Sequence, residues 1–201
     1  MYRVQLLPEP AETAKRWRQY CRDEGIGEIF LMAGQVYGFE DPRETGFDAA
    51  FEFPPHNVPF QNIGNSVQIL NPAYDGHILR YQDLADYYSC RQMDYPYELF
   101  KTVSPGWDNE PRKPGKGVTF AFATPELYRQ WLKNACNYTL RKEEEKRFVF
   151  INAWNEWGEG AYMEPDRRFG YAYLQETRKV LYKLPNSLNG SQGVPGQKQI
   201  P

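Results

Sequence analysis

The stretch RFVFINAWNEWGEGAYMEPD, Arg147–Asp166, decides how the rest of the chain is interpreted. It begins as a short apolar run and continues as a segment rich in Glu, Trp, Asn and Gly. A short apolar run of this kind is typical of a buried strand in a parallel sheet. Barrels and open parallel sheets place their active sites at the carboxyl ends of such strands. The stretch therefore predicts a strand over Arg147–Ala153 that leads into a functional loop.

The loop combines three carboxylates, two amides and two indoles within the fourteen residues Asn152–Pro165. Buried carboxylates cost several kcal/mol unless they are paired, so this composition is poor material for a core. Glycines at 158 and 160 would let the backbone turn sharply and bring Glu156 and Glu159 to one cavity. Two carboxyl groups about 5 to 5.5 Å apart, one protonated and one ionised, carry out retaining glycosidic chemistry. Glu156 and Glu159 are therefore the candidate catalytic residues.

Trp154 and Trp157 flank this pair of glutamates. Either indole would supply a flat face for a sugar ring, or an apolar wall that raises the pKa of one carboxyl group. The alternative is an acid-rich turn whose tryptophans pack between helices. The position of the segment, directly after a predicted strand, favours the catalytic interpretation.

Three more units of strand, loop and helix precede this segment. The predicted strands are Tyr2–Val4, Ile29–Met32 and Tyr97–Val103, and the predicted helices are Ala11–Glu24, Tyr81–Met93, Pro125–Arg141 with Thr124 as N-cap, and Gly170–Lys183. Residues 35–76 are predicted to be a long functional loop. Within it, Asp48, Glu52 and His56 either contact substrate or accompany a loop packed by Phe side chains.

Four such units predict an α/β fold with a parallel sheet. A (β/α)8 barrel of the TIM type takes about 250 residues and eight units, so residues 1–184 are expected to supply the C-terminal four βα units of such a barrel. The alternative is a small open doubly wound sheet, but neither a G-x-G-x-x-G nor a P-loop pattern follows any predicted strand. Residues 185–201 are expected to form a flexible tail.

Composition narrows the classes of function for this chain of 201 residues. A net charge of -2 disfavours nucleic acid and anionic lipid as partners. Two histidines and three widely spaced cysteines offer little for an imidazole-rich metal site or a disulfide framework, so neither a metal nor a cofactor is expected. A cation site made of carboxylates alone is the alternative that this composition leaves open. The absence of a signal peptide and of long apolar runs predicts a cytoplasmic protein. Aromatic residues make up 16% of the chain, which suits a sugar-binding surface.

A family resemblance rests on three blocks of sequence. FINAWNEWGEGAYMEPDRRFGYAYL (150–174) resembles the terminal signature of the WbsX-type glycosyltransferases, and GFDAAFEFPP (46–55) and SPGWDNEPR (104–112) resemble further blocks of that family in the expected order. These proteins take part in bacterial lipopolysaccharide and O-antigen assembly and are related to the endo-α-mannosidases of glycoside hydrolase family 99, which are (β/α)8 barrels. The resemblance spans nearly all of residues 2–183 and covers the second half of the family's barrel.

The resemblance implies roles for individual residues. Glu156 falls where the hydrolases have the carboxylate that assists attack by the substrate's own 2-hydroxyl, which gives a 1,2-anhydro sugar. Glu159 falls on their general acid and later base. Gly158 stands where the hydrolases commonly have His, a departure that bears on sugar recognition and argues against endo-mannosidase activity.

Other polar and aromatic residues are expected to bind substrate in the same cavity. Arg112, with its bidentate fork, suits an acidic sugar or a phosphate, although the segment around it would equally suit an Asx turn with a surface Arg. The expected substrate-binding set is Trp107, Asp108, Asn109, Arg112, Asn152, Trp154, Asn155, Trp157, Tyr162 and Glu164.

These features are compatible with three functions. The first is glycosyl transfer or trimming in surface polysaccharide assembly, with a glycan or sugar donor as substrate and membrane contact only through a lipid-linked glycan; hydrolysis of the endo-mannosidase kind is its variant. The second is glycan binding without catalysis by a half-barrel. The third is a sheet-forming fragment that pairs with another chain, because a half-barrel leaves strand edges open. The missing N-terminal half of the barrel would then be a partner.

Overall fold

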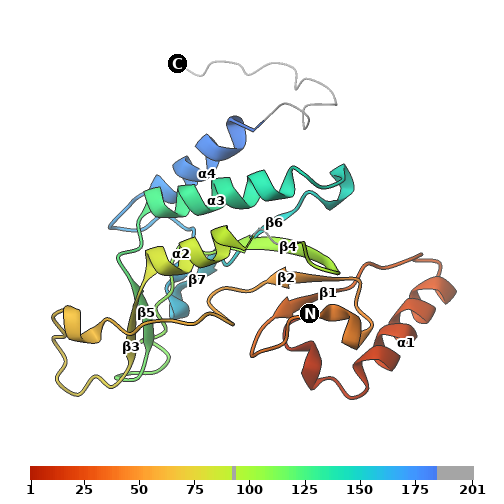
Figure 1. The fold of residues 1–201 in the computed structure, drawn as a ribbon, viewed down its shortest axis with the longest axis horizontal. Coiled ribbons are helices and arrows are strands. Elements are labelled where there is room, and N and C mark those ends of the chain that lie inside the picture. The colour runs from red at the N-terminus through yellow and green to blue at the C-terminus, as the bar shows by residue number, and fades with distance from the viewer. Residues whose placement is uncertain (92–93, 185–201) are drawn as a thin grey trace.

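The computed structural model describes residues 1–91 and 94–184 and is built around a parallel sheet (Figure 1). Four strands pair side by side in chain order, all parallel. They are β1 (Met32–Gln35), β2 (Ala49–Glu52), β4 (Glu98–Val103) and β6 (Val149–Ile151). The predicted α/β class with a parallel sheet is confirmed.

The helices cover the sheet unevenly. They are α1 (Pro10–Asp23), α2 (Tyr81–Cys90), α3 (Pro125–Thr139) and α4 (Ala172–Tyr182). Figure 1 shows α2 and α3 side by side over the sheet, α4 against α3, and α1 apart beside the β1 edge. The predicted N-cap of α3 is confirmed, because the Thr124 hydroxyl accepts a hydrogen bond from the Leu127 amide at 3.2 Å. A core of Leu79, Leu84, Val103, Trp131 and neighbouring side chains fills the space between these helices and the sheet.

Two short strand pairs stand beyond the main sheet. The pair β3 (His77–Arg80) and β5 (Val118–Ala121) is parallel, and the pair β7 (Asn155–Glu156) and β8 (Ala161–Tyr162) is antiparallel. Short 3-10 helices occupy Val4–Leu6, Pro42–Thr45, Gly64–Ser66, Glu144–Lys146 and Trp157–Glu159. The two strand pairs carry residues that wall the cavity described below.

The first predicted strand is wrong. Val4–Leu6 is a 3-10 helix, and only Met1 aligns with the sheet, where its ammonium donates to the Met32 carbonyl at 2.6 Å and its carbonyl accepts from the Gly34 amide at 2.9 Å. Pro8 and the left-handed backbone of Arg3 end any extended run here. Only a single residue is therefore left to pair.

The central strand β2 was missed, because it lies inside the segment predicted as a functional loop. Its sequence AAFE is short and ends in a charged residue, so it does not show the continuous apolar run of a buried parallel strand. The predicted strand Ile29–Met32 is displaced, since β1 begins where that prediction ends. The helices agree with prediction to within two residues at each end that can be compared. Met93, the predicted end of α2, and the predicted tail 185–201 lie outside the described residues.

The carboxylate of Glu52, at the end of β2, forms a buried ion pair with Lys101. Glu52 and Lys101 are 0% and 2% exposed, and the Lys101 ammonium lies 2.7 Å from Glu52 Oε1. The same ammonium donates to the Arg91 carbonyl at 2.5 Å, directly beyond α2. The Thr102 amide donates to the other Glu52 oxygen at 3.3 Å. This ion pair therefore connects β2, β4 and the C-terminal end of α2.

We expect the loss of either partner to destabilise the fold strongly. Lys101→Met or Glu52→Gln leaves one polar group buried without its counter-charge, which costs about 3 to 5 kcal/mol. Urea unfolding followed by circular dichroism measures this loss. The double variant Glu52→Leu/Lys101→Met should recover part of it, because a pair of apolar side chains leaves no buried charge. Single variants with an unchanged urea midpoint would contradict the role given to this pair.

Candidate active site

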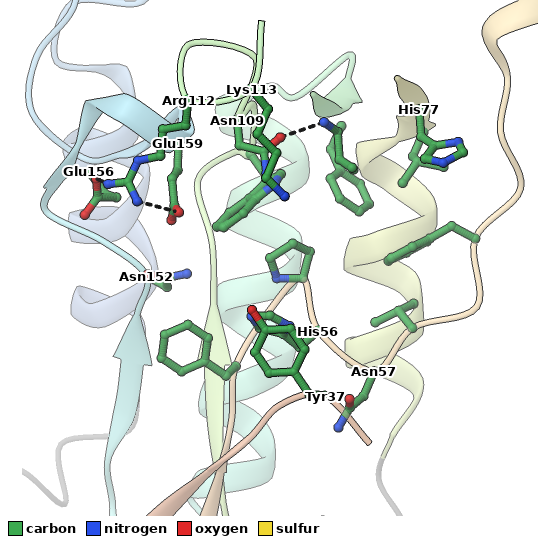
Figure 2. A pocket seen from close by; sticks show the side chains of 18 of the residues that line it. Tyr37, His56, Asn57, His77, Asn109, Arg112, Lys113, Asn152, Glu156 and Glu159 are labelled. Carbon is green, nitrogen blue, oxygen red and sulfur yellow. Dashed lines mark hydrogen bonds and ion pairs between the residues drawn. The ribbon is translucent and has the colours of Figure 1, made fainter. Parts of the chain in front are cut away.

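A cavity of about 1030 Å³ lies at the carboxyl edge of the sheet (Figure 2). The segments after β1, β2, β4 and β6 line it, together with residues of the β3 and β5 strands. The polar and charged side chains labelled in Figure 2 are Tyr37, His56, Asn57, His77, Asn109, Arg112, Lys113, Asn152, Glu156 and Glu159. The carboxyl ends of parallel strands are where α/β proteins assemble their ligand sites.

Glu156 and Glu159 both line this cavity and share one cation. Arg112 Nη2 lies 2.6 Å from Glu156 Oε1, and Arg112 Nη1 lies 3.0 Å from Glu159 Oε1. The glutamate side chains are 40% and 24% exposed, so both remain accessible from the cavity. The loop thus brings the two carboxylates together as the sequence predicts, with a guanidinium between them.

The two carboxylates differ in their surroundings. Partial burial raises the pKa of Glu159 above its ordinary value, the guanidinium of Arg112 opposes this rise, and the neighbouring charge of Glu156 adds to it. Glu156 is more exposed and makes the shorter contact with Arg112. Glu159 is therefore the carboxyl group better suited to hold a proton.

The backbone fixes where Glu159 lies. The Asp108 amide donates to the Glu159 carbonyl at 2.6 Å, which holds the segment after β4 against the glutamate turn. Gly160 has a φ of +60°, and a Cβ there would lie 2.8 Å from the Asp108 nitrogen. Only glycine allows both the left-handed backbone and this close approach.

The role of Gly158 differs from the expected one, which was to let the backbone turn sharply. The three nearest atoms to a Cβ at this position would all belong to Arg112, the closest being Nε at 3.0 Å. The missing side chain therefore gives the guanidinium room to reach both glutamates.

Arg112 lines the cavity as predicted, but its charge faces the two glutamates instead of lying free for a substrate anion. The segment around it also contains the Asx turn that its sequence equally suited, because the Glu110 amide donates to Asp108 Oδ1 at 3.0 Å. The segment therefore contains both an arginine that lines the cavity and the Asx turn that was the alternative.

Two predicted amides lie in the cavity wall. Asn109 is 9% exposed, and its Oδ1 accepts a hydrogen bond from the Val118 amide at 2.6 Å. Asn152 donates from Nδ2 to the Pro54 carbonyl at 3.0 Å, which joins the ends of β2 and β6. Each amide is thus held in place by a backbone partner while it faces the cavity.

The structure does not gather all the predicted binding residues in one cavity. Asp108, Trp157 and Tyr162 line a second hollow of about 410 Å³, and Trp107 lines both spaces. Trp154, Asn155 and Glu164 line neither of them. The short β7–β8 hairpin is the physical reason, because it divides the side chains of this segment between two sides, with Glu156 and Glu159 at the cavity and Trp157 and Tyr162 at the hollow. The prediction of a single shared cavity was wrong for these residues.

A cluster of rings in the cavity wall was not predicted from the sequence. The Tyr2 hydroxyl lies 3.3 Å from that of Tyr37 and 3.4 Å from His56 Nε2, and the rings of Tyr37 and His56 lie 4.6 Å apart. Burial and the hydrogen bond with Tyr37 raise the pKa of Tyr2 to about 12, so its phenol stays protonated. Burial and the charge of Arg3 lower the pKa of His56. For Tyr2 and Tyr37, the high aromatic content of the chain was the only sequence signal that pointed to a place in a binding site.

The described residues offer no ready metal site. Across residues 1–91 and 94–184, no group of three or more His, Cys, Asp or Glu side chains is arranged to hold a metal ion. None of the helices in this part of the chain has the length and apolar character that crossing a bilayer requires.

The space beside Gly158 leads to a specific prediction about the pKa of Glu159. Arg112→Gln should raise the pKa of Glu159 further, because it removes the cation that lowers this pKa. Gly158→Ala should raise it in the presence of Arg112, whose guanidinium the new methyl group displaces, and should have no further effect beside Arg112→Gln. Carboxyl ¹³C titration by NMR measures the shift. Equal effects of Gly158→Ala in both backgrounds would show that the two residues are not coupled.

One family model and two relatives match most of this chain. The model of the family described as Glycosyltransferase WbsX matches residues 1–177. Two relatives, both named uncharacterized protein WxcX, come from two strains of Xanthomonas campestris pv. campestris and are 48% and 47% identical over 187 residues. Each match covers 92% of this chain and 27% of the relative, so the chain spans little more than a quarter of the length of these relatives.

Solved structures resemble the fold. A glycoside hydrolase-like protein matches 87% of this chain and 50% of its own, with a TM-score of 0.56 and 18% identity. An endo-alpha-mannosidase of glycoside hydrolase family 99 from Bacteriodes thetaiotaomicron, in complex with BIS-TRIS-propane, matches 90% of this chain and 54% of its own, with a TM-score of 0.47 and 15% identity. With the family model matching 177 residues from the first onward, the chain belongs to the WbsX glycosyltransferase family.

Proposed function

We propose that this chain carries the active site of a carbohydrate-active enzyme that transfers a glycosyl unit during assembly of bacterial lipopolysaccharide or O-antigen. The observation that carries the proposal is the pair Glu156 and Glu159, bridged by Arg112 at the edge of a cavity large enough for a sugar substrate. Membership of the WbsX family supports sugar chemistry. Lipid-linked or soluble glycans are the proposed substrates, and the cytoplasm is the proposed location.

The proposed mechanism uses the two carboxylates in different states. In the first step Glu159 gives its proton to the leaving oxygen as the bond from that oxygen to C1 breaks, while the sugar's 2-oxygen bonds to C1 and passes its proton to Glu156. In the second step the acceptor oxygen bonds to C1 as the bond from the 2-oxygen to C1 breaks, the acceptor's proton goes to Glu159, and the 2-oxygen takes back its proton from Glu156. The raised pKa of Glu159 suits the first proton transfer. Hydrolysis differs only in that water takes the acceptor's place.

We propose also that residues 1–184 form half of a (β/α)8 barrel. The ring of Phe150 lies against those of Phe51 and Phe100. These rings are on the sheet face opposite to that of Lys101 and Val149, which face the helices. Phe30 and Phe148 extend this apolar face and are 53% and 54% exposed. Large rings of this kind would fill a barrel interior. The match to half of the glycoside hydrolase-like protein supports this arrangement.

Removal of the proposed acid should abolish most of the transfer. In the full-length protein, Glu159→Gln should lower the rate by about 10² to 10⁴, since general acid–base catalysis contributes that much, and Glu156→Gln should lower it comparably. The measurement is the amount of surface polysaccharide in a strain complemented with each variant. Glu145→Gln, an exposed carboxylate outside both cavities, is the matched control. Normal polymer with Glu159→Gln would rule out the proposed mechanism.

The half-barrel proposal predicts self-association of the isolated chain. With Phe30 and Phe148 exposed on this face, its sedimentation coefficient should rise with concentration, because exposed apolar faces associate. Phe30→Ser/Phe148→Ser should weaken this rise, whereas Tyr20→Ser, on the outer surface of α1, should not. A chain that stays monomeric at all concentrations would count against the uncovered barrel face.

A further inference from the structure

The second hollow lies next to the glutamate turn. Trp107 and Phe120 line both this hollow and the main cavity, so the two spaces share a wall. The hydrogen bond from the Asp108 amide to the Glu159 carbonyl lies within that wall. A volume of about 410 Å³ falls within the range of small-molecule sites, roughly 300 to 1,000 Å³. Nothing in the proposed mechanism uses this space.

An aromatic pair in a fixed orientation is part of its lining. Trp157 stacks on Tyr162 with ring centroids 3.7 Å apart and planes 16° from parallel. The Trp157 indole N–H donates to Glu164 Oε2 at 2.6 Å, and the Tyr162 hydroxyl donates to Asp166 Oδ2 at 3.2 Å. Trp157 nevertheless remains 46% exposed. An indole that is held at its edge and open on its surface is preorganised for a flat ligand.

Phe122 also borders the hollow, and its backbone is strained. Phe122 follows β5 with a φ of 66° and is 58% exposed. The left-handed region is rare for a bulky side chain and costs on the order of 1 to 3 kcal/mol. Burial of the ring does not repay this cost, because most of the ring is open to solvent. The guanidinium carbon of Arg80, 6.0 Å from the ring centroid, is a contact on this exposed ring. Backbone strain at an exposed side chain is found mainly at functional sites.

Polar groups surround these rings. The carboxylate of Asp166 and the guanidinium of Arg168 both border the hollow. A pyranose ring presents C–H groups on its faces and hydroxyl groups around its edge, so it would match aromatic faces ringed by such donors and acceptors. The carboxylate of Asp166 already accepts hydrogen bonds from the Tyr162 hydroxyl and from the amides of the two residues that precede Gly170. An apolar chain would offer the Arg168 guanidinium no hydrogen-bond partner.

We propose that this hollow binds a pyranose unit of the glycan chain away from the reacting bond, with Trp157 and Phe122 as its stacking surfaces. The identity of the ligand as a carbohydrate rests on the proposed function. The site would act as an extension of the main cavity, in which the glycan is held by a unit that undergoes no chemistry. Long substrates would then be held better than short ones.

The experiment follows the indole N–H signal of Trp157 by ¹H–¹⁵N NMR. The chain carries Glu159→Gln to prevent turnover and is titrated with α-mannotetraose and with the lipid-free polysaccharide of the source bacterium. At least one of these probes should shift the Trp157 signal in a saturable manner. Phe122→Asn, which tolerates the left-handed backbone, should weaken that binding on the order of tenfold, as expected for the loss of one aromatic contact. Phe30→Asn, a change at a comparably exposed ring on the sheet face, should leave it unchanged.

Three outcomes would overturn the proposal. They are a Trp157 signal that neither probe shifts, a shift that does not saturate, and equal weakening by Phe122→Asn and Phe30→Asn. Failure of the proposed function is distinguishable, because it would leave the binding intact while the polysaccharide assay with Glu159→Gln showed normal polymer.

Discussion

The ammonium of Lys101 lies where β2, β4 and the end of α2 meet, and the segment that follows β4 lines both cavities. Glu52 neutralises it at 2.7 Å, the Arg91 carbonyl accepts from it at 2.5 Å, and the ring of Tyr138 on α3 lies 4.7 Å away. Burial raises the pKa of Glu52 and lowers that of Lys101, and the charge of each partner opposes the shift of the other. The pair thereby fixes the sheet relative to two helices.

The segments that follow β4 and β6 leave this sheet side by side, and their backbones are held close together. The Asp108 amide bonds to the Glu159 carbonyl, and Gly160 lets the two backbones approach closely. Arg112, four residues beyond Asp108, then reaches both glutamates through the space that Gly158 leaves. The spacing of the two segments and the two glycines are thus parts of one arrangement, which sets the distance from the guanidinium to each carboxylate. Trp107 and Phe120, which line both spaces, form the wall between the main cavity and the hollow that Trp157 borders.

Much of this arrangement could be predicted from the sequence, and the parts that could not have definite causes. Helices with proline starts and apolar faces, such as α3, carry their own signals. The strand β2 does not, because Glu52 looks like a loop residue until its partner Lys101, 49 positions away, is known. The convergence of Glu156 and Glu159 followed from local spacing. The pairing of Arg112 with both, and the division of the aromatic residues between two spaces, depend on contacts between distant segments that no local pattern contains.

The bridge made by Arg112 also constrains the chemistry proposed for this site. An oxocarbenium-like transition state gains stability from nearby negative charge, and a guanidinium between the two carboxylates offsets part of that charge before substrate binds. A sugar that enters must therefore either accept the guanidinium as a hydrogen-bond donor to its hydroxyl groups or displace it from one carboxylate. Displacement from Glu159 would raise the pKa of that group at the moment when a proton donor is needed, because the cation that opposes protonation has moved away. Arg112 would then act as a positioning residue that couples substrate entry to the protonation of Glu159.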